Sequence, residues 1–215
     1  QTLADRGITD VFMLTGGGAM HLNHSLGTHP ALTTTFTHHE QALSMAAEAY
    51  YRLTNRLAVV NVTSGPGGTN AITGVYGAFV DSIGMLVISG QVKTETTVRH
   101  TGLPLRQYGD QELDIEELVR PITKYAVMVT DPRSIRYHLE KSLHLATSGR
   151  PGPVWLDIPL DVQAAKAEYD AALKLKDRTA IDGTGDDKGG GTEAVRAVIG
   201  EIRLSGYETS RDIRL

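Results

Sequence analysis

Cysteine is absent from the 215-residue chain, which excludes disulfide bonds and metal sites built on thiolates. Basic residues are too few to outnumber the acidic ones, at 21 against 25, and they form no cluster. This balance argues against a surface for nucleic acid. Long apolar runs are also missing, since none approaches the roughly 18 residues that a membrane span requires. We therefore expect neither a nucleic-acid nor a membrane partner.

The start of the chain has no initiator methionine and no basic segment followed by an apolar one. We therefore expect a cytoplasmic protein without a signal peptide, of which this chain is a fragment. Hydrophobic residues make up 40% of the chain and charged residues 21%, a balance that suits a folded core. The length fits one full domain plus a tail.

Short apolar runs alternate with helical patterns along most of the chain. The runs that predict strands are residues 11–14, 33–37, 58–62, 85–88 and 153–158. Two of them, 58–62 and 85–88, are almost continuously apolar, as expected for strands that are covered on both faces. This alternation predicts an α/β fold, in which helices cover both faces of a parallel sheet.

Helices are predicted between these runs by apolar residues at helical spacing. The three stripes are Leu43, Ala46, Ala47 and Tyr50; Ala71, Ile72, Val75, Ala78 and Phe79; and Ile135, Leu139 and Leu143. Asp131 followed by Pro132 is typical of a helix start, and Gly149 is placed to end that helix. Gly74 and Gly77 lie within the second helix, where each costs about 1 kcal/mol relative to alanine. We expect close packing there, against a strand or another helix.

The composition of the chain changes after about residue 163. Residues 183–191 are rich in glycine and aspartate, which is typical of a flexible linker. Apolar residues in helical register return within residues 192–204. We therefore predict one domain at residues 1–163, a linker at 164–191, and the start of a truncated second domain at 192–215.

Glu40 is the first candidate for chemistry. It opens a predicted helix directly after His39, and the small and apolar residues that follow, among them Leu43 and Met45, could shield it from water. Burial disfavours the charged form of a carboxyl group and so raises its pKa. The ordinary alternative is an acidic residue that complements the helix dipole, worth about 0.3–1 kcal/mol.

A glycine-rich turn, residues 63–70, is the second candidate. It reads Thr-Ser-Gly-Pro-Gly-Gly-Thr-Asn and joins a predicted strand to a helix, whose first N–H groups could bind a ligand. It is not a Walker loop, because it lacks Gly-Lys-Ser/Thr. The ordinary alternative is a tight turn that needs glycine for positive φ. Gly16, Gly17 and Gly18, after the first strand, allow the same two interpretations.

These segments, together with Asp81-Ser82 and residues 89–92, resemble in order and spacing the pyrimidine-binding domain of thiamine-diphosphate enzymes, most nearly the acetolactate-synthase-like group. The resemblance covers residues 1–163 and implies flavodoxin-like winding. It also implies that Glu40 activates the cofactor through its pyrimidine ring. The cofactor contacts that it implies are Glu40, Gly17, Gly18, Gly65, Pro66, Gly67 and Asn70. The chain departs from the family at Thr15, where a proline usually precedes the glycines.

The same resemblance aligns Asp110-Gln111-Glu112 with a Phe-Gln-Glu segment that lines the substrate pocket in acetolactate-synthase-like enzymes. It implies that Gln111 is a second catalytic residue, close to the reacting atoms; an exposed polar loop is the ordinary alternative. Asp110 replaces the aromatic residue and so changes the size and charge of the pocket. Arg99 and Arg106 lie in the same irregular stretch, which could contribute substrate contacts, and Arg106 could bind a substrate carboxylate.

The histidines do not predict a metal site. His21 and His24 are three residues apart, but no third ligand accompanies them. In the resembled family, a second domain with a Gly-Asp-Gly…Asn signature binds Mg²⁺ and the cofactor diphosphate, and this chain contains no such signature. The resemblance therefore implies a fragment that is inactive alone, from a homodimer or homotetramer whose sites lie between subunits.

The activity implied by the resemblance is the decarboxylation of a 2-oxo acid with transfer of the remaining unit to an acceptor. Two alternatives stay open. The first is a sister thiamine-diphosphate decarboxylase or lyase without the acceptor site, which the change at Asp110 motivates. The second is a non-catalytic degenerate subunit that keeps the fold, against which the presence of Glu40 argues.

Overall fold

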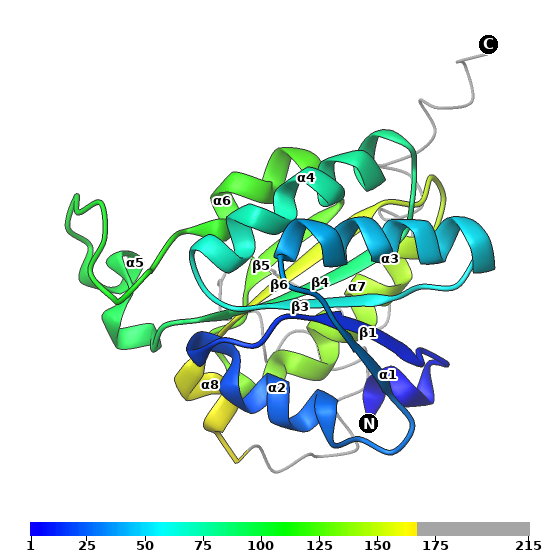
Figure 1. The fold of residues 1–215 in the computed structure, drawn as a ribbon. Coiled ribbons are helices and arrows are strands. Elements are labelled where there is room, and N and C mark those ends of the chain that lie inside the picture. Colours follow the sequence, from blue (N-terminus) through cyan, green and yellow to red (C-terminus); the bar gives the residue numbers. More distant parts are fainter. Residues whose placement is uncertain (167–215) are drawn as a thin grey trace, which may run out of the picture.

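All strands of the central sheet run parallel. The computed structural model describes residues 1–166, which form one six-stranded sheet in the order β2-β1-β3-β4-β6-β5 (Figure 1). The strands are β1 (Asp10–Met13), β2 (Thr33–Phe36), β3 (Val59–Val62), β4 (Met85–Gln91), β5 (Tyr125–Met128) and β6 (Pro153–Pro159). Five of them coincide with predicted runs. β5, a half-buried edge strand, was not predicted.

Helices cover both faces of the sheet, so the predicted fold class is confirmed (Figure 1). One layer holds α3 (Glu40–Thr54), α4 (Pro66–Val80) and α6 (Ile115–Val119), and the other holds α1 (Thr2–Asp5), α2 (Met20–Gly27), α7 (Ile135–Thr147) and α8 (Leu160–Ala164). Short α5 (Val98–Thr101) lies beyond the carboxyl ends of the strands. Four single turns of 3₁₀ helix complete the fold: η1 (Gly17–Ala19), η2 (Thr94–Thr96), η3 (Arg120–Ile122) and η4 (Pro132–Ser134).

Two apolar cores result from the alternation of side chains along each strand. Val59 points into the core beneath α2 and α7, whereas Val60 points into the core beneath α3 and α4. Trp155 on β6 is fully buried in the second core, and its neighbour Leu156 is fully buried in the first. Strands buried on both faces explain the continuous apolar runs in the sequence.

The predicted start signal of α7 lies one turn before the α-helix, and the predicted end signal lies directly after its C-cap residue. The Asp131 side chain accepts a hydrogen bond from the Arg133 amide at 3.0 Å and so begins η4, which leads into α7. Gly149 has a φ of 56°, directly after the cap residue Ser148, and ends the helix. No helix within residues 1–166 is long and apolar enough to cross a membrane. The predicted linker and second domain lie outside the described residues, apart from 164–166, and stay predictions.

Close packing of α3 against α4 explains the two helical glycines. A Cβ at Gly74 would lie 2.4 Å from Ser44 Oγ and 2.8 Å from the backbone nitrogen of Met45. Gly77 is less crowded, since a Cβ there would lie 3.2 Å from Oε2 of Glu48. The partner is therefore a helix, and only Gly74 touches its backbone.

Gly74→Ala is expected to lower the free energy of unfolding by about 1–3 kcal/mol, because the new methyl group overlaps the α3 backbone. Gly77→Ala is the matched control in the same helix. It meets only a flexible side chain and gains up to about 1 kcal/mol of helix propensity. Urea denaturation of the two variants checks the difference, and equal destabilisation by both would contradict this packing.

Candidate functional site

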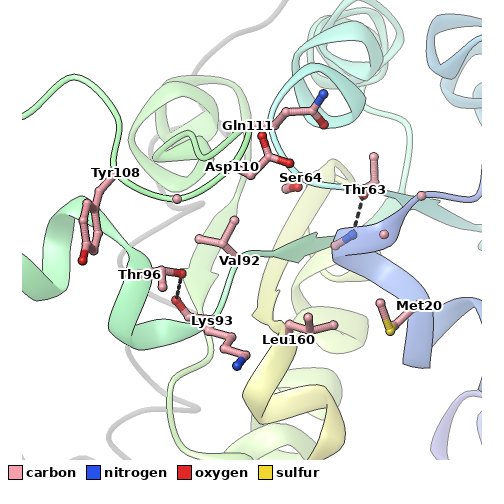
Figure 2. Close-up of a pocket in the computed structure, with 14 residues that line it drawn as sticks. Met20, Thr63, Ser64, Val92, Lys93, Thr96, Tyr108, Asp110, Gln111 and Leu160 are labelled. Atoms are coloured by element: carbon pink, nitrogen blue, oxygen red, sulfur yellow. Dashed lines mark hydrogen bonds between the residues drawn. The ribbon is translucent and has the colours of Figure 1, made fainter.

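An open pocket of about 720 Å³ lies at the carboxyl ends of β1, β3 and β4 (Figure 2). Its walls are the turn at residues 16–18, the end of β3 at Thr63 and Ser64, and two stretches at 92–96 and 108–111. After β1, the chain adds β2 on one side of it and β3 on the other. In open α/β sheets, ligands bind outside the carboxyl ends of the strands at such a switch point.

The turn at residues 16–18 packs directly on Thr63. The Gly18 amide donates a hydrogen bond to Thr63 Oγ1 at 3.1 Å, and a Cβ at Gly16 would lie 2.5 Å from Thr63 Cβ. A Cβ at Gly18 would lie 2.6 Å from Ser64 Oγ. Gly17 has open space where a Cβ would point. The two outer glycines are therefore needed for packing, whereas Gly17 presents free surface to the pocket.

Two amide side chains hold this turn from the opposite side. Asn23 on α2 donates to the Gly16 carbonyl at 3.2 Å and accepts from Asn61 at 2.8 Å. Gln163 on α8 donates to the Gly18 carbonyl at 2.7 Å. The turn is thus fixed by β3, α2 and α8 together.

The second glycine turn brings Gly65 against the backbone of Gln111. Gly65 has a φ of 56°, and a Cβ there would lie 2.1 Å from the Gln111 carbonyl oxygen. Gln111 itself has a φ of 55°, which is uncommon for a residue other than glycine. The turn at Gly65 and the turn at Gln111 therefore pack backbone against backbone. The Gln111 side chain is left exposed at the edge of the pocket (Figure 2).

Glu40 begins α3 and faces the start of α4. Its Oε2 accepts a hydrogen bond from Nδ2 of Asn70 at 3.0 Å, and its Oε1 lies 3.7 Å from where a Cβ of Gly67 would be. Oε1 has no hydrogen-bond donor among residues 1–166. The carboxylate is thus oriented by one oxygen while the other is available to a ligand.

The residues around Glu40 shield it less than the sequence suggests. Leu43 is buried, but Met45 is 44% exposed, and Glu40 itself is half-buried. His39 does not contact the Glu40 carboxylate, because its Nδ1 accepts a hydrogen bond from the Gln41 amide at 3.2 Å and caps the helix. Within this chain, water can still reach Glu40.

Carboxylates fix the stretch that forms the far wall of the pocket. Glu112 accepts hydrogen bonds from three backbone amides, among them Gly109 at 3.1 Å. Arg99 forms ion pairs with Asp114 and Glu116, both at 2.9 Å. Arg99 is therefore structural. Arg106, the other arginine considered for substrate binding, does not line the pocket.

Asp157 lies fully buried beneath this wall, on β6. It accepts hydrogen bonds from Ser89 Oγ at 2.6 Å and from Gln91 Nε2 at 2.9 Å. The same Gln91 nitrogen donates to the Leu113 carbonyl at 2.8 Å, and Trp155 donates to Ser89 at 2.8 Å. Burial raises the pKa of the Asp157 carboxyl group to about 7, against the opposing effect of the two hydrogen bonds. This network couples the sheet to the stretch that carries Gln111.

Comparison with known proteins agrees with this geometry. Residues 1–118 match the family described as "Thiamine pyrophosphate enzyme, N-terminal TPP binding domain". The chain belongs to this family. The acetolactate synthase large subunit of Buchnera aphidicola is 38% identical over 169 residues, which cover 79% of this chain and 28% of that protein.

Two further relatives give the same picture. Acetolactate synthase 1, chloroplastic, of Oryza sativa is 38% identical over 174 residues, covering 79% of this chain and 25% of the relative. The acetolactate synthase isozyme 3 large subunit of Escherichia coli is 38% identical over 162 residues, which cover 75% of this chain and 27% of that protein. The chain thus spans about a quarter of the length of the curated relatives that it matches.

The Glu40 carboxylate fits the pyrimidine part of thiamine pyrophosphate, although Glu40 is not among the residues that line the pocket. Glu40 Oε1 is available for a hydrogen bond. The Cβ positions of Gly65 and Gly67 are taken by the Gln111 carbonyl and the Thr63 side chain, so these glycines serve close packing within the chain. No group of three or more histidine or acidic residues that could hold a metal ion occurs within residues 1–166. Of the sequence-predicted residues, Glu40, Gly67 and Asn70 lie together, as do Gly65 and Gln111.

Several residues of the site were not found by sequence reasoning. Thr63 joins the two glycine turns, and Asn23 and Gln163 fix one of them from other elements. Nothing local in the sequence marks Asn23 or Gln163. Thr63 begins the predicted turn at residues 63–70, but its contact with residues 16–18 was not predicted. Asp157 did carry a signal, because a carboxylate inside an apolar strand covered on both faces must find partners.

Gly65→Ala is expected to destabilise the protein by about 2 kcal/mol or more, because alanine disfavours positive φ and its methyl group would overlap the Gln111 carbonyl. Gly17→Ala is the control, with open space at the same turn-forming edge. Thermal unfolding of both variants checks this. An unchanged melting temperature for Gly65→Ala would contradict the close backbone contact between Gly65 and Gln111.

Stability is expected to fall as pH rises from about 4 to 7, through Asp157. Its pKa is about 7 in the folded chain and near 3.8 when exposed, so the folded state binds the extra proton across this window. The stabilising contribution is complete below the unfolded-state pKa and is lost by about pH 7, with a slope of at most ~1.4 kcal/mol per pH unit. Urea denaturation across this range should show a flatter profile for Asp157→Asn; parallel profiles would contradict a buried protonated carboxyl group.

Proposed function

We propose that this chain is the pyrimidine-binding part of an enzyme that decarboxylates a 2-oxo acid and joins the remaining acyl unit to a carbonyl acceptor. The family membership and the names of the acetolactate synthase relatives support this activity. The observation that carries the proposal is the Glu40 carboxylate, oriented by Asn70 and with Oε1 available beside Gly67. A residue that only complemented a helix dipole would not need this arrangement.

Each residue of this group has a distinct task. Glu40 would hold a proton at Oε1 toward a pyrimidine nitrogen, and Asn70 would keep the carboxyl plane fixed. The turn at Gly65, Pro66 and Gly67 would pack on the ring. Thiamine pyrophosphate, when bound, supplies the electron sink for breaking and making bonds next to a carbonyl carbon.

Gln111 would contact the substrate from the edge of the pocket. Its backbone is held by Gly65 and its side chain is exposed there. Gly17 and Gly18, on the opposite wall, would face the cofactor or its substrate. Carboligation is preferred over a simple decarboxylase because eight similar relatives are described as acetolactate synthases.

The rest of the proposal concerns parts outside this chain. A second domain would bind Mg²⁺ and the cofactor diphosphate, so the fragment alone would be inactive. The intact enzyme would be a cytoplasmic homodimer or homotetramer. The division at residues 1–163, 164–191 and 192–215 belongs to the same proposal.

Glu40→Gln is expected to lower the rate of CO₂ release from pyruvate by 10²-fold or more in the full-length protein, the scale typical of a lost acid–base group. Isothermal titration with thiamine pyrophosphate and Mg²⁺ tests binding separately. Glu48→Gln, about two turns further along α3 and paired with Arg52, is the matched control and should keep the wild-type rate. Equal heats and equal rates for wild type and Glu40→Gln would contradict the proposal and favour a degenerate subunit.

A further inference from the structure

Asp110 places an unpaired carboxylate in the wall of the pocket. Its carboxylate points toward the hydroxyl of Ser64 (Figure 2). It has no hydrogen bond or ion pair with any of residues 1–166. A carboxylate can only accept hydrogen bonds when ionised, so a ligand here must offer it donors.

The neighbouring carboxylates are all engaged. Glu112 binds backbone amides, Asp114 binds Arg99, and Glu116 binds both Arg99 and Arg120. These carboxylates engage Arg99 and Arg120, and Arg106 does not line the pocket. Lys93 is the one cation among the pocket-lining residues of the described chain, and it extends away from Asp110 (Figure 2).

Other polar groups in the same walls also lack partners. The Ser64 hydroxyl and the Tyr108 phenol both line the pocket, and neither forms a hydrogen bond through its side chain within residues 1–166. The pocket volume of about 720 Å³ lies in the range of about 300–1,000 Å³ that is typical for sites of larger ligands. A second 2-oxo acid would meet a like charge at Asp110.

We propose that the acceptor is an uncharged, polyhydroxylated aldehyde or ketone of sugar size, rather than a second 2-oxo acid. This inference rests on the proposed function and names its acceptor class. Hydroxyl groups of the acceptor donate to Asp110 and exchange hydrogen bonds with Ser64 and Tyr108. Asp110 is a specificity-determining residue, because the carboxylate attracts donors and repels anions.

The overall reaction balances without an oxidant or reductant. The bond between the carbonyl carbon and the carboxylate of the 2-oxo acid breaks, and the carboxylate leaves as CO₂. The electron pair of that bond forms the new carbon–carbon bond to the carbonyl carbon of the acceptor. The acceptor oxygen takes one proton from solvent and becomes a hydroxyl group.

The test is a competition in the full-length enzyme loaded with thiamine pyrophosphate and Mg²⁺. Pyruvate serves as donor, and D-erythrose or butanal is added as acceptor; these have the same carbon count, with and without hydroxyl groups. Products are quantified by mass spectrometry, and CO₂ release is followed in parallel. We expect the erythrose product to exceed both acetolactate and the butanal product by about ten-fold or more at equal acceptor concentrations, as hydrogen bonds to a charged group would give.

Variants then assign the preference to Asp110. Asp110→Asn should lower the ratio of erythrose to butanal product about ten-fold, and Asp110→Phe should favour acetolactate. The Asp110 side chain is exposed, so neither change should unfold the protein, which circular dichroism checks. Glu95→Gln, an exposed acid of the same stretch that does not line the pocket, is the control and should leave the ratio unchanged.

The two proposals fail in different ways. Release of CO₂ with acetolactate as the main product, together with an erythrose-to-butanal product ratio that the Asp110 variants leave unchanged, would overturn the acceptor class alone. No CO₂ release from pyruvate or any other 2-oxo acid would overturn the proposed function and the acceptor class with it.

Discussion

The site depends on the close approach of two backbone turns at the carboxyl edge of the sheet. Thr63 lies between them, with Gly16 and Gly18 on one side and Gly67 on the other, each too near for a Cβ to fit without a shift. This contact brings the end of β1 against the end of β3. Because the sheet is parallel, both turns emerge at the same edge. Every functional residue discussed above is placed by that geometry.

The carboxyl groups around these turns have different roles. Three carboxylates form hydrogen bonds with backbone amides or ion pairs with arginines: Glu112, Asp114 and Glu116. These interactions fix the conformation of a stretch with little regular structure. Asp157 is buried, and its raised pKa follows from its removal from water. Glu40 and Asp110 differ from these, because each leaves at least one oxygen to the pocket region.

Much of the fold could be predicted from the sequence, because strands that are buried on both faces have almost continuously apolar sequences. β5 was missed, whereas β2, an edge strand of the same length, was recognised by its three β-branched threonines. The glycine turns were recognisable as turns, but their partners were not. Thr63 and Asn23 act through contacts that cross the chain by 45 and 7 residues, and no local pattern encodes them. The shielding of Glu40 was overestimated, because α3 turns Met45 toward the surface.

The most direct test of the central claim is a crystal structure of the full-length protein with thiamine pyrophosphate and Mg²⁺. The account predicts Glu40 Oε1 within roughly 2.6–3.2 Å of a pyrimidine ring nitrogen, with Asn70 still donating to the other oxygen. A pyrimidine ring bound elsewhere, or a Glu40 side chain turned into bulk water, would contradict it.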